Sequence, residues 1–135
     1  MWYYDNELYD EASTEHVGFV YLITDLTTNR KYVGKKLFWN TRKLKPLKGK
    51  SRRRKQVVES DWKTYYGSNE ELQQIVESSD EDRFERIILH LCHKKGEMSY
   101  LEAREQFDRN VLLSEEYYNN FIGCKIHGKH VAGLK

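Results

Sequence analysis

The sequence has no long apolar run, only two cysteines and almost no net charge. No window approaches the roughly 18–20 apolar residues that a transmembrane helix needs, so we expect no membrane partner. Cys92 and Cys124 are too few for a disulfide framework, which favours a reducing, cytoplasmic setting. Residues 1–10 are acidic and aromatic, a composition that excludes a signal peptide.

Aromatic side chains are plentiful by comparison. The chain of 135 residues contains 10 Tyr, 5 Phe and 3 Trp, which is too aromatic for a disordered segment. Its length corresponds to about one domain with a modest core. We therefore expect a single layer of helices packed on a small sheet.

The net charge of +2 conceals an uneven distribution. Residues 1–29 hold six acids and no Lys or Arg, whereas residues 30–63 hold 14 Lys and Arg against two acids. The densest part, residues 42–55, has nine cations and no acid. This block favours a polyanion partner. A solvated surface loop and a nuclear-import signal are the alternatives that charge alone leaves open.

The first predicted elements form a hairpin. Residues 17–24 are β-branched and aromatic and apolar on both faces, as in a central strand. Residues 25–30 are typical of a turn in which Asn29 adopts a left-handed conformation. Residues 31–35 form a second short strand, and so short a connection makes the pair antiparallel.

The later elements complete an α+β pattern. Ser68 and Glu71 have capping-box spacing at the start of a helix, residues 84–92 read as a third strand, and residues 97–111 as a longer helix. The order β-β-α-β-α predicts a small three-stranded antiparallel sheet flanked by helices. We expect an N-terminal extension (1–16), a domain (17–123) with the basic insert 42–55, and a basic, His-rich tail (124–135). The aromatic N-terminus (Trp2, Tyr3, Tyr4) is expected to be a docking strand or to cover the core, rather than to stack on bases.

Two tyrosines of the hairpin, Tyr21 and Tyr32, carry the strongest sign of function. Singly, each is an ordinary strand tyrosine. Together, Phe19-Val20-Tyr21 and Tyr32-Val33-Gly34 resemble the paired signature of the GIY-YIG nuclease family, whose two tripeptides are also about ten residues apart. The resemblance covers about residues 17–123 and implies the fold of that family.

The resemblance also implies site residues. Family members have an Arg on a helix, eight residues after the Gly of the second tripeptide; counted from Gly34, this is Arg42. A basic residue directly after that Gly is also common, and Lys35 stands there. A metal-binding Glu in a context like Tyr100-Leu101-Glu102 implies Glu102, with Glu105 as a rival in the alignment. An Asn that follows a Tyr implies Asn119.

These residue types suit phosphodiester hydrolysis. Mg²⁺ (or Mn²⁺) needs only one or two carboxylates, so Glu102 is a sufficient anchor. Arg42 would bind the scissile phosphate in a fork geometry. The resemblance implies that one hairpin tyrosine is the general base and the other orients water or phosphate; we favour Tyr32 as the base. Asn119 is expected to position, because an amide does not titrate.

Structural interpretations of the same residues remain open. Ser99 and Glu102 also have capping-box spacing. Gly34 could mark a bulge or a close backbone approach, and Asn119 a turn. Arg42 could be only the first residue of a solvated run.

A zinc site is a further alternative. His90 and Cys92 on a strand and Cys124 and His127 in the tail could supply four ligands. They lack paired C-x-x-C spacing, so we expect zinc to be absent.

The sequence thus predicts a metal-dependent endonuclease acting on double-stranded DNA, with a phage homing endonuclease as one implied role. A homodimer or oligomer on DNA, the cleaved sequence, and nicking against double-strand cutting stay open. A non-catalytic DNA-binding module and a zinc-stapled interaction protein are the rival functions. The cations expected to bind DNA lie in the basic block: Lys36, Lys43, Lys45, Lys48, Lys50, Arg52, Arg53, Arg54 and Lys55.

Overall fold

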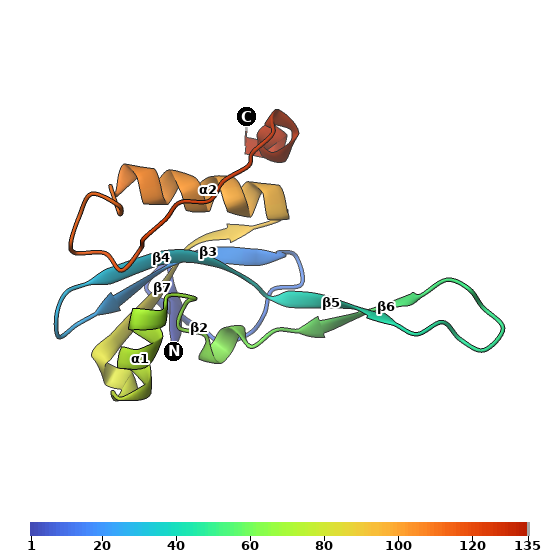
Figure 1. Ribbon diagram of the computed structural model, residues 1–135, viewed down its shortest axis with the longest axis horizontal. Helices are drawn as coiled ribbons and strands as arrows, with labels where there is room; N and C mark the ends of the chain where they lie inside the picture. Colours follow the sequence, from blue (N-terminus) through green and yellow to red (C-terminus); the bar gives the residue numbers. More distant parts are fainter. Residues whose placement is uncertain (135) are drawn as a thin grey trace.

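The computed structural model describes residues 1–134 and is built on a five-stranded mixed sheet of order β2-β1-β7-β3-β4 (Figure 1). Its strands are β1 (Trp2–Tyr4), β2 (Glu7–Tyr9), β3 (Gly18–Asp25), β4 (Lys31–Leu37) and β7 (Phe84–Cys92). β3 lies between β7 and β4 and pairs antiparallel with both. Seven of its eight residues are buried, as expected for a strand that is apolar on both faces.

The prediction of three strands is wrong, because the N-terminal residues are part of the sheet. Asp5 and Asn6 both have positive φ angles, 52° and 66°, and form a tight turn that joins β1 to β2. Such a turn matches the twist of a two-residue hairpin. β1 then pairs parallel with β7, so β1 and β2 add two strands to the sheet.

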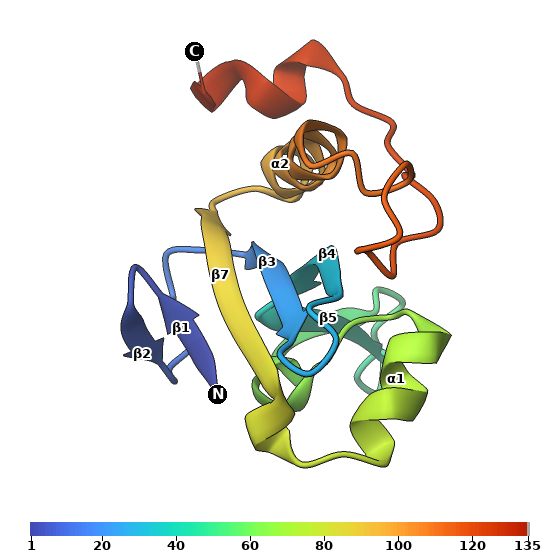
Figure 2. The same ribbon diagram turned by 90° about the vertical axis from the view of Figure 1, so that its left-hand side faces the viewer.

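The two faces of the sheet carry different layers (Figure 2). Helix α2 (Lys95–Asp108) packs on one face, where its Met98 joins Val20 and Val33 of the sheet in one buried cluster. The other face holds an aromatic core that includes Trp2, Phe19 and Trp62, beside helix α1 (Glu70–Glu77). Three short 3₁₀ helices complete the described chain: η1 (Trp62–Thr64), η2 (Glu81–Arg83) and η3 (Gly128–Leu134).

The basic insert is a second correction. Only the middle of the insert, residues 45–53, is a loop: the flanking strands β5 (Trp39–Leu44) and β6 (Arg54–Glu59) pair antiparallel as a separate two-stranded ribbon. In Figure 1 this ribbon extends away from the rest of the molecule. We call residues 39–59 the basic ribbon.

The helices begin close to where the sequence predicts. Asn69, not Ser68, is the N-cap of α1 and accepts a hydrogen bond from the Leu72 amide at 3.0 Å. α2 starts at Lys95, two residues earlier than predicted. Asn29 has φ 60°, which confirms the left-handed turn after β3. Neither α-helix in residues 1–134 combines the length and hydropathy that crossing a bilayer requires.

Candidate active site

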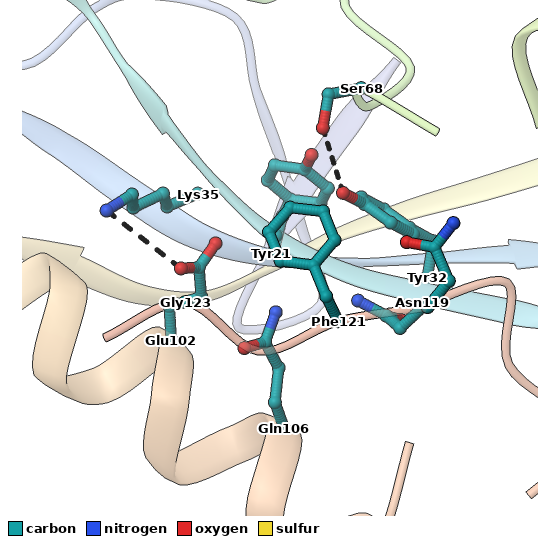
Figure 3. Close-up of a pocket in the computed structure, with 11 residues that line it drawn as sticks. Tyr21, Tyr32, Lys35, Ser68, Glu102, Gln106, Asn119, Phe121 and Gly123 are labelled. Atoms are coloured by element: carbon teal, nitrogen blue, oxygen red, sulfur yellow. Dashed lines mark hydrogen bonds and ion pairs between the residues drawn. The ribbon is translucent and has the colours of Figure 1, made fainter. Parts of the chain in front are cut away.

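A cavity of about 310 Å³ opens at β4, the edge strand of the sheet (Figure 3). Its lining comes from β3, β4 and α2, from the residue Ser68 just before α1, and from residues 119–123. Five of the six residues predicted to be catalytic line it, all except Arg42. The complete lining is Tyr21, Tyr32, Gly34, Lys35, Ser68, Glu102, Gln106, Asn119, Asn120, Phe121 and Gly123.

Gly34 decides where the Tyr21 phenol lies. The two residues are paired across β3 and β4, and a β-carbon at position 34 would overlap the Tyr21 hydroxyl and lie 2.6 Å from its Cζ. The ring of Tyr21 therefore crosses directly over the backbone of the edge strand. Gly34 marks a close approach, not a bulge, and this approach lets a side chain that is 99% buried reach the cavity.

Tyr32 reaches the cavity from β4 itself. Its hydroxyl lies 2.9 Å from Ser68 Oγ, and its ring centroid is 6.2 Å from that of Tyr21. Gly67 has φ 90° and permits this packing, because a β-carbon there would lie 3.0 Å from the Tyr32 ring. The segment 65–68 thus holds a phenol in place between α1 and the sheet.

Both phenols are more weakly acidic than free tyrosine. Burial raises the pKa of Tyr21 well above its usual value, and the neighbouring Tyr65, Tyr32 and Glu102 raise it further. Burial also raises the pKa of Tyr32, while the hydrogen bond from Ser68 lowers it. The negative charge of Glu102 acts on both groups, which indicates that carboxylate and phenols share one electrostatic environment.

Glu102 projects from α2 toward Lys35 of β4. Lys35 Nζ lies 3.9 Å from Glu102 Oε1 and donates a hydrogen bond of 2.8 Å to Ser99 Oγ. Burial raises the pKa of Glu102, and Lys35 opposes that shift. Because α2 begins at Lys95, Ser99 and Glu102 lie inside the helix, and the capping interpretation of Glu102 is wrong.

The structure distinguishes Glu102 from its rival Glu105. Glu105 pairs with His90 at 2.8 Å and with Arg109 at 2.9 Å, and these bonds lower its pKa. It does not line the cavity. Only one of the two carboxylates therefore faces the tyrosines.

Asn119 binds the free edge of β4. Its Oδ1 accepts a hydrogen bond from the Val33 amide at 3.0 Å, and its Nδ2 donates to the Val33 carbonyl at 2.8 Å. The side chain thereby imitates a paired strand, next to the bridge between Lys31 and Tyr117. Asn119 does not form a turn, and its amide pairs with the backbone of β4 beside the cavity.

Arg42 lies outside this cavity. The expected helix after Gly34 is absent, because residues 39–44 pair with β6, and Arg42 is an exposed residue of β5 opposite Gln56. The predicted placement of Arg42 on a helix beside the tyrosines is therefore wrong. Lys35 supplies a cation at the cavity instead.

The predicted DNA-binding cations lie along the basic ribbon, except Lys36. Lys36 is bound to Asp61 at 2.6 Å and lies 4.0 Å from the Tyr65 ring centroid. Within residues 1–134, the other eight make no ion pair. These exposed side chains are Lys43, Lys45, Lys48, Lys50, Arg52, Arg53, Arg54 and Lys55.

The four residues considered for zinc are not gathered into a site. His90 is paired with Glu105, and burial raises the pKa of the Cys92 thiol to about 12. Cys124 is exposed in the tail. No group of three or more His, Cys, Asp or Glu side chains in the described part of the chain is arranged to hold a metal.

Several residues of the cavity were missed by sequence reasoning. Ser68 has the sequence pattern of a helix cap, and nothing in that pattern indicates its hydrogen bond with Tyr32. Phe121 lies in a segment without periodicity. Gln106 alone has a usable signal, because it follows Glu102 by four residues on a helix and must share its face.

Comparison with known proteins identifies one matching family model. The model described as "Putative endonuclease segE, GIY-YIG domain" matches residues 2–122. No curated protein and no solved structure matches this chain. The family match includes β1 and β2, which agrees with their place in the sheet.

Proposed function

The chain belongs to the GIY-YIG nuclease family, and from this premise we propose that it is a Mg²⁺-dependent endonuclease of double-stranded DNA. The observation that carries the proposal is the cavity at β4, where two phenols, an ammonium group and one carboxylate meet. Phosphodiester hydrolysis needs a base for water, positive charge near the phosphate and assistance for the leaving oxygen.

The residues present fit a divalent cation. Glu102 offers a carboxylate inside a polar cavity, and Mg²⁺ retains most of its waters and needs few protein ligands. Glu102 would hold the ion. When bound, the ion supplies Lewis acidity and stabilises the leaving oxygen. Mn²⁺ has similar ligand preferences and should substitute.

We infer that Tyr32 is the general base. It faces the cavity and is hydrogen-bonded to Ser68, whose hydroxyl can donate to a phenolate. In the free protein, burial and Glu102 keep the phenol protonated, so positive charge at Glu102 favours its deprotonation. Tyr21 is more deeply buried and is assigned to orient the water or phosphate.

The basic ribbon is proposed to bind the DNA backbone. Its eight unpaired cations and Arg42 project from a two-stranded arm, a shape that fits a DNA groove. If about six of them neutralise phosphates, log affinity should fall against log salt with a slope of about −5. The sequence leaves the cleaved site and the oligomeric state on DNA open; mapping of cut ends would identify the first, and sedimentation on a duplex the second.

A plasmid assay tests the function. Supercoiled plasmid is incubated with the wild type and Mg²⁺, with and without a chelator, beside Glu102→Gln. We expect relaxed or linear product from the wild type, loss with the chelator, and a rate at least about 100-fold lower for Glu102→Gln. Glu105→Gln, one turn along the same helix, is the matched control and should keep cutting.

Equal cutting by the wild type and Glu102→Gln would contradict the proposed site. Salt-dependent binding of duplex DNA without cutting by any version would instead identify a non-catalytic binding module.

A further inference from the structure

Gln106 is a buried residue of the cavity with one unused end. The residue is only 5% exposed, and its Nε2 donates a hydrogen bond of 3.1 Å to the Val33 carbonyl. Oε1 is buried and has no hydrogen-bond partner in the described part of the chain. A buried acceptor without a donor is rare in folded proteins, and a bound water, an ion or a functional role accounts for such cases.

The orientation of this amide is fixed by its neighbours. The Val33 carbonyl can only accept, and it receives both Gln106 Nε2 and Asn119 Nδ2. Turning the Gln106 amide over would place two oxygens against each other. Oε1 therefore points away from β4.

Glu102 lies one helical turn before Gln106, on the same face of α2. Figure 3 shows both side chains projecting from the helix into the cavity. Among residues 1–134, Glu102 has one ion-pair partner, Lys35 at 3.9 Å, and Gln106 Oε1 has no donor. Two oxygen acceptors on one face with so few donors favour a cation and its hydration waters between them.

We propose that Gln106 Oε1 is the second protein oxygen of the divalent-cation site, binding the hydrated ion beside Glu102. This inference rests on the proposed metal-dependent function. Gln106 is a positioning residue: it holds the ion and its water ligands in register with the tyrosines, while Glu102 supplies the charge. Partners of this kind typically contribute a factor of about 10–100 to metal affinity.

The test is Mn²⁺ binding to the intact protein without DNA, measured by the loss of the free-ion electron paramagnetic resonance signal. Gln106→Met removes both polar ends and should bind Mn²⁺ at least about tenfold more weakly than the wild type. Gln106→Glu keeps an oxygen while it removes the Nε2 donor, so it should bind at least as tightly as the wild type. Gln74→Met, on the exposed side of α1, is the control and should bind as the wild type does.

Thermal unfolding without metal separates this role from a structural one. Gln106→Met replaces an unpaired acceptor with an apolar group, and Asn119 still satisfies the Val33 carbonyl. Its metal-free Tm should therefore equal or exceed that of the wild type. A lower Tm combined with unchanged Mn²⁺ affinity would overturn the inference.

Two further outcomes have distinct meanings. If Glu102→Gln abolishes Mn²⁺ binding while Gln106→Met binds normally, or if Gln106→Glu is as weak as Gln106→Met, the role of Gln106 is refuted and the metal site stands. If the wild type binds no Mn²⁺, both this inference and the proposed metal dependence fail.

Discussion

At the scale of single residues, two small features determine the site. Gly34 has no side chain, so the Tyr21 phenol passes over the edge strand into the cavity. Asp25, at the end of β3, is fully buried and binds Arg83 through two bonds of 2.8 Å. It also accepts a hydrogen bond from Tyr118, directly before Asn119, and so ties the chain that closes the cavity to the sheet.

Gly34→Ala should lower both stability and cleavage. The added methyl collides with the Tyr21 ring, and overpacking of this kind costs about 1–3 kcal/mol. Because a misplacement of about 1 Å can cost 100-fold in rate, we expect at least a tenfold loss of plasmid cleavage. Urea unfolding and cleavage rates measure the two effects. Gly128→Ala, where no atom lies within 4 Å of an added β-carbon, should change neither.

The stability of the protein should fall in acid through Asp25. Its bonds to Arg83 lower the folded-state pKa from 3.8 to about 2. The unfolded state therefore takes up the proton first, and the stabilisation is present above about pH 4 and lost as the pH falls toward 2. Urea midpoints between pH 5 and pH 2.5 should show this decline, and Asp25→Asn should flatten it. Asp10→Asn, an exposed residue, should keep the slope of the wild type; a wild-type midpoint independent of pH would contradict the prediction.

At the scale of elements, the basic ribbon places like charges opposite each other. Lys43 lies directly opposite Lys55 across β5 and β6, and no acid compensates for this pair in residues 1–134. Like charges facing each other destabilise a strand pair. The arrangement is understandable if a polyanion supplies the missing negative charge.

Replacing Lys43 and Lys55 with Thr should weaken DNA binding without loss of stability. Removal of two phosphate contacts should make the slope of log affinity against log salt shallower by about 1.8. The unfolding midpoint should stay the same or rise, because a repulsive pair is removed. Fluorescence anisotropy with a duplex at several salt concentrations measures the slope. The double change Lys94→Thr and Lys95→Thr serves as the control; an equal change in its slope would argue against the ribbon as the DNA contact.

At the scale of the whole molecule, the N-terminal strands support the site from behind. Trp2 is 2% exposed and donates a hydrogen bond to the Trp62 carbonyl at 2.7 Å. Its ring lies 5.0 Å from Phe19 and 5.3 Å from Tyr21, in edge-to-face contacts. The first residues of the chain thus form the core on which a cavity tyrosine rests, as expected of Trp2 as a core cover.

Trp2→Ala should cost about 3–5 kcal/mol of unfolding free energy, because a large buried side chain is removed from a packed core. Urea unfolding followed by far-ultraviolet circular dichroism measures the loss. Tyr3→Ala, on the same strand but 40% exposed, should cost far less. Similar losses for the two variants would show that β1 contributes little to the core.

The sequence by itself determined the hairpin, the tyrosine pair and the family, because these depend on local patterns. The apolar run of residues 17–24, the turn at Asn29 and the spacing of the two tripeptides are readable within about 20 residues. The helix that carries Glu102 was also predicted, with a start two residues from the observed one. Glu102 and Glu105 could not be ranked, because they lie three residues apart on one helix and differ only in what they face.

Only the tertiary structure decided which side chains meet. Asn119 binds Val33 across 86 residues of sequence, and Trp2 packs on the aromatic core because β1 pairs with β7, a partner that the sequence did not indicate. Arg42 lies outside the cavity because its segment pairs with β6. Glu105 faces away from the tyrosines because it is bound to His90 and Arg109. Contacts between distant segments are set by strand order and packing, which depend on the free energy of the whole chain and leave little trace in any short stretch of it.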